Sequence, residues 1–90
     1  MVNIPPERRF EISRKADQFI QNLPEKLRLR IKEAIGYLIA GNVNHLNIKA
    51  LTNHPHEYRL RVGRIRILFH ADKDLLFIYK AGFRGDVYRK

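Results

Sequence analysis

The spacing of the apolar residues changes near residue 57, and this change limits most strongly what the chain can fold into. Before that point, apolar side chains recur every three or four residues, as on one face of a helix. From Glu57 they recur every second residue, as in strands with one buried face. A chain of 90 residues has room for one domain. We therefore expect a single α+β domain over residues 1–90, with helices packed on a small, mainly antiparallel sheet.

The first half of the chain predicts a short strand and two helices. Residues 10–12 alternate in polarity, and Ser13 is suited to cap the helix that follows. Pro24 interrupts the helical pattern, Glu25 suits the first turn of a second helix, and Gly41 suits its end. The apolar stripes of the two helices are Ala16, Phe19, Ile20 and Leu23, and then Leu27, Ile31, Ala34, Ile35 and Leu38. Because the joint between them is short, the helices are expected to form an antiparallel hairpin.

The second half predicts strands joined by tight turns. A polar connector over residues 42–55, with a short apolar piece at residues 48–51, precedes them. Gly63 fits the first position of a two-residue hairpin between strands that begin at Glu57 and at Ile65. The remaining predicted elements are a turn at residues 72–74, a mostly apolar strand at residues 75–81 that ends at Gly82, and a last short strand at residues 86–89.

The composition is strongly basic, with 18 Lys and Arg against 9 Asp and Glu, a net charge of +9. This balance favours a polyanionic partner, either nucleic acid or an acidic protein. The absence of Cys excludes disulfides, zinc ribbons and thiol catalysis. Residues 1–7 lack the apolar centre of a signal peptide, and no apolar run approaches the roughly 18 residues of a membrane span. We therefore expect a cytoplasmic protein with no membrane partner.

The positive charge is concentrated in the second half of the chain. Residues 1–45 carry 8 basic and 5 acidic side chains, whereas residues 46–90 carry 10 basic and 4 acidic ones. Because side chains alternate along a strand, Arg59 and Arg61 share one face, and the turn brings Arg66 beside them. Three guanidinium groups on one face repel each other unless an anion lies among them, and a phosphate backbone is the obvious anion. The alternative is a solvated face whose charges protect a sheet edge.

The C-terminal segment places Arg84, Tyr88 and Arg89 around two glycines. A tyrosine and arginines beside a basic sheet are suited to stack on a base and to bind a phosphate. The alternative is a terminal edge strand whose tyrosine packs on the core.

The histidines offer weaker candidates. His70 shares a strand face with Arg66 and is either a general acid or base, or a surface residue at the end of its strand. His54 and His56 lie in one loop, but a metal site needs three or four ligands and none completes the set nearby. We therefore predict no metal site and no cofactor.

Three features follow one another along the chain in a recognisable order. They are the helical hairpin at residues 16–38, the run Tyr-Arg-Leu-Arg-Val-Gly at residues 58–63 with an arginine-containing strand after it, and the ending Gly-Phe-Arg-Gly-Asp-Val-Tyr at residues 82–88. Together they resemble the RelE/ParE superfamily of bacterial and archaeal type II toxins over nearly the whole chain. The resemblance implies a compact RelE-like ribonuclease fold and a toxin that cleaves messenger RNA in the ribosomal A site without a metal. It also implies a cognate antitoxin wrapped around the toxin.

The resemblance assigns catalytic roles to three residues. Arg66 matches the strand arginine that contacts the scissile phosphate, Arg84 the second catalytic arginine, and Tyr88 the C-terminal tyrosine. These side chains fit the chemistry, because cleavage by a ribose 2′-hydroxyl needs a proton acceptor and donors that stabilise a pentacoordinate phosphorane.

The basic residues of the hairpin depart from the family pattern in one respect. RelE-type toxins often have Lys where Arg59 and Arg61 stand here. Because Arg stays protonated, Arg59 is expected to stabilise charge, which leaves Tyr88 or His70 to accept the proton. The residues expected to bind RNA are Arg59, Arg61, Arg64, Lys80 and Arg89.

Two other functions remain open at this point. ParE-type members share the fold, lack the set of catalytic arginines and tyrosine, and poison DNA gyrase; the presence of Arg66, Arg84 and Tyr88 favours the nuclease. A non-catalytic RNA-binding module is the other alternative. In each toxin case an acidic, amphipathic antitoxin segment suits a basic chain with apolar residues such as Leu29 and Ile39 outside the helical stripes.

Overall fold

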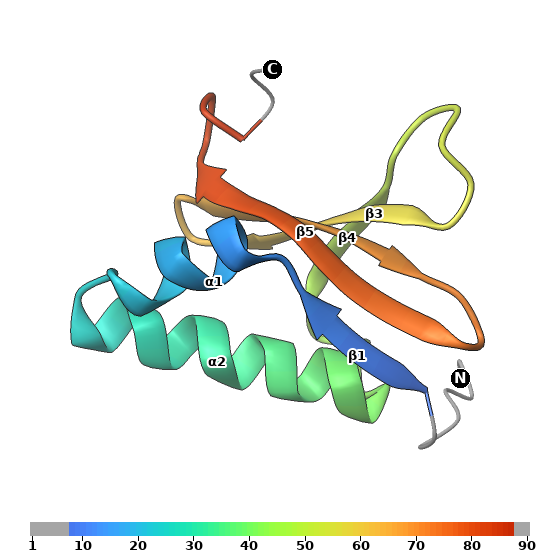
Figure 1. The fold of residues 1–90 in the computed structure, drawn as a ribbon, viewed down its shortest axis with the longest axis horizontal. Coiled ribbons are helices and arrows are strands. Elements are labelled where there is room, and N and C mark those ends of the chain that lie inside the picture. Colours follow the sequence, from blue (N-terminus) through green and yellow to red (C-terminus); the bar gives the residue numbers. More distant parts are fainter. Residues whose placement is uncertain (1–7, 88–90) are drawn as a thin grey trace.

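Two helices lie on one face of a five-stranded sheet in the computed structural model, which describes residues 8–87 (Figure 1). The elements in chain order are β1 (Arg9–Ile12), α1 (Arg14–Gln21), α2 (Glu25–Ala40), β2 (Asn47–Ala50), β3 (Glu57–Val62), β4 (Ile65–Ala71) and β5 (Leu75–Phe83). The strands are arranged in the order β1-β5-β4-β3-β2, with β1 parallel to β5 and every other pair antiparallel. The predicted α+β fold, with a helical hairpin on a mainly antiparallel sheet, is confirmed.

Local signals set the ends of both helices. The Ser13 hydroxyl accepts a hydrogen bond from the Ala16 backbone amide at 3.2 Å, which caps α1 as expected. Pro24 precedes α2, and Gly41 ends it in the left-handed conformation with φ of 80°. A residue with a Cβ is disfavoured there, so the glycine stops the helix. No helix within residues 8–87 has the length and apolar character needed to cross a membrane.

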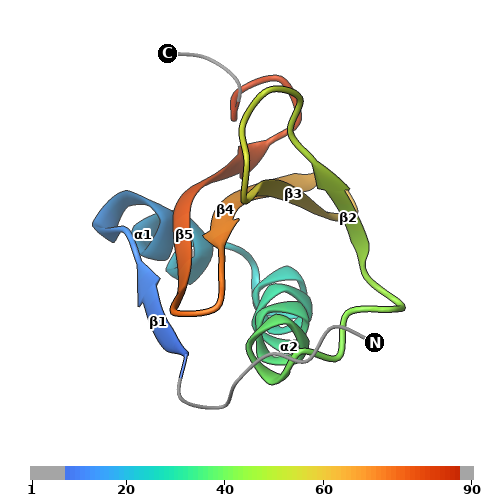
Figure 2. The same ribbon diagram turned by 90° about the vertical axis from the view of Figure 1, so that its right-hand side faces the viewer.

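The core lies between the helices and the inner face of the sheet. Ala16, Ile20, Ile31 and Leu38 from the helices are buried there. The sheet residues that face them are Leu60, Ile65, Ile67, Phe69, Leu76 and Ile78. Figure 2 shows the sheet curving around α2, so that its opposite face carries no helix. We call this opposite surface the helix-free face, and it is the side on which the candidate site lies.

Two predictions for the second half of the chain were wrong in their element boundaries. Residues 47–50 of the expected connector form the edge strand β2, because Ile48 lies opposite Leu60 and is half-buried against the core. Strand β5 continues through Gly82 to Phe83 instead of ending at Gly82.

The last predicted strand is wrong over its described part. Asp86 and Val87 lie in a turn, closed by hydrogen bonds from both of their amides to the Phe83 carbonyl at 3.0 and 3.3 Å. Gly85 takes a φ of 93° in that turn, a conformation that breaks an extended strand. Residues 88–90 lie outside the described residues.

Candidate nucleic-acid interface

The β3–β4 hairpin brings its arginines together by register. Gly63, with φ of 57°, and Arg64 form the predicted two-residue turn, and Val62 pairs with Ile65 across it. Arg61 then lies directly opposite Arg66, because pairing continues outward from the turn. Residues that face each other in an antiparallel pair project from the same side of the sheet.

A basic surface follows from this register across four strands. One row of paired positions consists of Lys49, Arg59, Leu68 and Lys80, and the next consists of Asn47, Arg61, Arg66 and Gly82. We call the five basic residues of these rows the cationic face: Lys49, Arg59, Arg61, Arg66 and Lys80. They project from the helix-free face, because the positions between them along each strand, such as Leu60 and Ile67, belong to the core.

Arg66 is the buried member of the cationic face. Its side chain is only 6% exposed, and its Nη1 donates hydrogen bonds to the carbonyls of Gly63 at 3.0 Å and of Ile65 at 3.3 Å. A guanidinium group cannot lose its proton in a protein, so a charge is held at this point. The carbonyls of the turn fix the orientation of that charge.

Arg59 has one polar partner and one buried donor without a partner. Its Nη2 donates to the Asn47 side-chain oxygen at 3.1 Å, which connects β3 to the edge strand β2. Its Nε is buried and has no hydrogen-bond partner among the described residues. Within the described part of the chain, this N–H is therefore an unsatisfied donor beneath the cationic face, whereas the Nη2 atom is oriented by β2.

The turn after β5 adds further basic residues at the same end of the sheet. The Arg84 amide donates to the Arg64 carbonyl at 3.0 Å, which holds these two exposed arginines next to each other. Val87, only 1% exposed, packs over Gly82, whose missing side chain would lie 3.6 Å from the Val87 Cα. From α2, the Arg30 guanidinium lies 3.7 Å from the place that a side chain at Gly63 would take.

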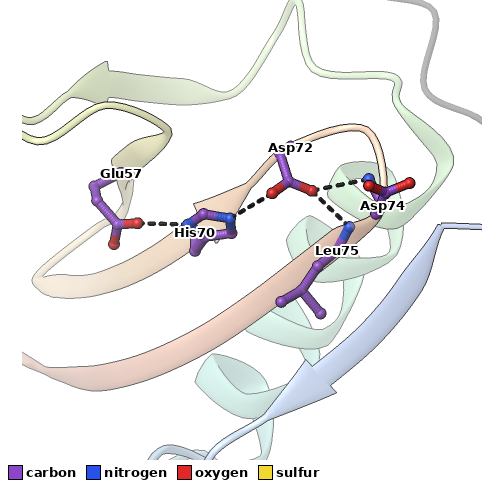
Figure 3. Close-up of polar contacts among 5 residues, drawn as sticks. All are labelled: Glu57, His70, Asp72, Asp74 and Leu75. Carbon is purple, nitrogen blue, oxygen red and sulfur yellow. Dashed lines mark hydrogen bonds and ion pairs between the residues drawn. The ribbon is translucent and has the colours of Figure 1, made fainter.

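His70 lies farther along the helix-free face and is held by two carboxylates (Figure 3). Its Nδ1 lies 2.6 Å from Glu57 Oε2, and its Nε2 lies 2.9 Å from Asp72 Oδ2. Hydrogen bonds to Asp72 and Glu57 raise the pKa of His70, and in turn His70 and the amides of Asp74 and Leu75 lower the pKa of Asp72 to about 2. We call these three residues the His70 cluster. With both ring nitrogens engaged, His70 is poorly placed to accept a proton from a ribose.

The structure thus brings together some of the predicted site residues and not others. Arg61, Arg64, Arg66 and Arg84 surround the β3–β4 turn, whereas His70 is separated from Arg66 by three residues of β4 and belongs to its own cluster. The predicted site residues Tyr88 and Arg89 lie outside the described residues.

Several residues of this surface were missed by the sequence reasoning. Asn47 and Lys49 lie on the unpredicted strand β2, so their places beside Arg61 and Arg59 were not foreseen. Glu57 faces His70 at a position that counting outward from the Gly63 turn would have identified. Within residues 8–87, no group of three or more His, Asp or Glu residues is arranged to hold a metal ion.

Comparison with solved structures identifies the fold. A chain of the RelB-RelE antitoxin-toxin complex from Methanococcus jannaschii matches with a TM-score of 0.72 and 24% identity, over 86% of this chain and 93% of that one. The protein has the RelE fold. The archaeal RelE-RelB complex from Pyrococcus horikoshii OT3 matches with a TM-score of 0.74 and 22% identity, over 88% of this chain and 97% of that one.

A structure with lower sequence identity has a similar fold. The E. coli DinJ-YafQ toxin-antitoxin complex matches with a TM-score of 0.76 and 12% identity, over 92% of this chain and 99% of that one. No protein-family model matches the sequence, and no curated protein sequence matches it either. The RelE-like architecture expected from the three sequence features is therefore confirmed at the level of the fold.

Proposed function

We propose that this chain is the toxin of a type II toxin-antitoxin system and that it cleaves messenger RNA by attack of a ribose 2′-hydroxyl on the adjacent phosphate. The attack breaks the bond from phosphorus to the 5′-oxygen of the next nucleotide, and leaves a 2′,3′-cyclic phosphate and a 5′-hydroxyl. The observation that carries the proposal is the buried Arg66 at the centre of the cationic face. The RelE fold supports it, because the matched chains come from toxin-antitoxin complexes.

The arrangement of the arginines is suited to this reaction. The transition state carries extra negative charge on the phosphoryl oxygens, and fixed guanidinium donors stabilise that charge. Arg66 is held in place by the carbonyls of Gly63 and Ile65, so little reorganisation is needed when the charge develops. Arg84, held beside the same turn, supplies the second cation, and Tyr88 is the proposed proton acceptor. We propose no metal ion in this mechanism.

The proposed partners follow from the charge of the surface. A messenger RNA, presented by the ribosome, places its phosphates along the cationic face in the cytoplasm. An acidic, amphipathic antitoxin segment neutralises the same charges and covers apolar residues such as Leu29 and Ile39, which are 55% and 43% exposed.

The test is induced expression of the full chain, followed by primer extension on a translated message. Cuts in phase with the codons, together with growth arrest, are the expected result, and the Arg66→Ala variant should produce neither. Arg14→Ala, at an exposed position on the helix side, is the matched control and should remain toxic. Intact messages accompanied by DNA-damage signalling would instead indicate gyrase as the target and would contradict the proposal.

A further inference from the structure

A cavity of about 670 Å³ opens on the helix-free face beyond the cationic face. Its walls are mostly apolar and aromatic, and come from the β2–β3 loop and from β5: Leu51, Pro55, Leu75, Phe77 and Tyr79, together with His54. Glu57 and His70 are its polar lining. Figure 1 shows the β2–β3 loop rising above the sheet on the side opposite the helices, so the cavity and the cationic face share one surface.

A β-bulge joins the cavity to the cationic face. The pairing of β4 with β5 shifts between Leu68 and Phe69, which leaves Tyr79 as the extra residue. Tyr79 therefore lines the cavity while its neighbour Lys80 takes its place opposite Leu68 in the cationic face. The aromatic ring of Tyr79 and the charge of Lys80, which are adjacent in sequence, thus lie on the same side of the sheet. On β3 the same continuity holds, because Glu57 is two residues, about 7 Å, from Arg59.

The chemistry of the cavity differs from that of the cationic face. The His70 cluster consists of two carboxylates around one imidazole, so its net charge is negative whether or not the ring is protonated, in a chain of net charge +9. Burial and the Glu57 carboxylate raise the pKa of Tyr79 to about 12, so its phenol stays protonated. Glu57 accepts from His70 and from Tyr79 and, with roughly four lone-pair sites, can accept further donors.

We propose that this cavity is a nucleobase subsite, in which the base stacks against the aromatic residues of β5 while the Glu57 carboxylate reads its hydrogen-bond donors. Guanine is the base that fits best, because its Watson–Crick edge carries two adjacent N–H donors that a carboxylate accepts together. Uracil presents two carbonyl acceptors and a single donor to the same carboxylate. Aromatic walls with one polar group at the edge are the usual way in which single-stranded RNA bases are bound. The inference rests on the proposed function, since it requires RNA along the cationic face.

The test measures the binding of uncleavable 2′-O-methyl RNA hexamers to the full chain by fluorescence anisotropy. The hexamers are oligouridine and oligouridine with one guanosine at each position in turn. We expect the best guanosine hexamer to bind about tenfold more tightly than oligouridine, the size of one bidentate base contact. Replacing that guanosine by inosine, which lacks the 2-amino donor, should remove most of the gain.

Two variants and a control test whether the preference for guanosine arises from the cavity. Glu57→Gln should bring the guanosine-to-uridine ratio close to one, whereas Glu33→Gln, the same charge change on the exposed surface of α2, should leave it unchanged. Phe77→Leu keeps the His70 cluster and an apolar wall but removes a stacking surface. It should weaken the guanosine hexamer about fivefold or more and leave a hexamer with an abasic site at that position unaffected.

Several outcomes would overturn the inference. These are equal binding of all hexamers, a guanosine preference that both variants retain, or variants that weaken antitoxin binding while the base preference stays intact. Thermal unfolding of each variant verifies that it is folded. If Glu57→Gln does not fold, Phe77→Leu still decides the test. Message cleavage in cells is read separately, so a toxin that cuts messages without any base preference would leave the proposed function standing and refute only the subsite.

Discussion

Arg61 and Arg66 lie directly opposite each other across the β3–β4 ladder, the first exposed and the second buried. Like charges at opposing positions destabilise a sheet, so the hairpin folds with a repulsion that an uncharged pair would avoid. A phosphate bound between the two guanidinium groups would offset that repulsion. We therefore expect the stability of the hairpin to depend on phosphate concentration, which the first prediction tests.

The exposed partner of this pair provides the first prediction. Arg61→Gln should raise the free energy of unfolding by about 0.2–1 kcal/mol in low-salt buffer, because it removes one of the two like charges that face each other. This gain in stability should be smaller at high phosphate concentration, because phosphate then already screens the repulsion between Arg61 and Arg66 in the parent protein. Urea unfolding in both buffers measures the gain. The control is Arg14→Gln, which makes the same change in net charge at a position outside the sheet. A gain of equal size in both buffers would contradict the anion site.

The buried partner tests the proposed reaction. Arg66→Lys keeps a positive charge but loses the planar group that the Gly63 and Ile65 carbonyls orient, and it should slow message cleavage on the order of 100-fold. Arg84→Ala and Tyr88→Phe should likewise relieve growth arrest on expression. If all three variants are folded and as toxic as the parent, the assignment of the catalytic residues is wrong.

Much of this arrangement could be predicted from the sequence because local signals determine it. The two-residue turn at Gly63 fixes the register of β3 against β4, and with it the juxtaposition of Arg61 and Arg66. Ser13 and Gly41 determine helix ends through their own backbone and side-chain chemistry. The two-residue alternation of apolar side chains and the identity of the turn residues were therefore sufficient to predict the hairpin and its register.

The parts that were missed depend on contacts between distant segments. Strand β2 is four residues long and exists because β3 offers it an edge, which its own sequence does not reveal. The shift in register that places Tyr79 and Lys80 on one face depends on how β5 meets β4. The burial of Val87 over Gly82 depends on the turn that follows β5.

The His70 cluster predicts a dependence of stability on pH. Because the pKa of His70 is raised on folding, its contribution is fully present below about 6.5 and is lost as the pH rises through the folded value. The pKa of Asp72 is lowered from 3.8 to about 2, so its contribution is lost as the pH falls through that range. His56 also faces the ring, 6.0 Å away between ring centroids, and the titratable side chains of His54 and Tyr79 line the same cavity.

The measurement is the melting temperature as a function of pH for the parent and for His70→Gln. The parent should be more stable by the largest margin between about pH 4 and 6.5, and the margin should diminish in alkaline solution. A margin that stays constant from acid to alkaline pH would mean that His70 acts through packing alone.

Gly82 controls how the turn that carries Arg84 sits on the sheet. A Cβ at this position would make ordinary contacts of 3.6 Å with Val87, so Gly82→Ala should be close to the parent in activity. Gly82→Leu has no room beneath Val87 and should displace the turn, which lowers cleavage while the core stays folded. Hydrogen exchange at the Arg84 and Val87 amides, bonded to the Arg64 and Phe83 carbonyls, reports the displacement. Unchanged protection in Gly82→Leu would contradict this role.

The extent of the cationic face is testable through the salt dependence of RNA binding. Each phosphate contact to a single strand contributes about 0.7 to the slope of log K against log salt concentration, because a counterion is released. Lys49→Gln, on the edge strand β2, should therefore reduce the slope for an uncleavable RNA by about that amount, and so should Lys80→Gln. Lys26→Gln, exposed on the helix side, should leave the slope unchanged. If all three variants reduce the slope equally, RNA responds to net charge rather than to the ordered rows of the helix-free face.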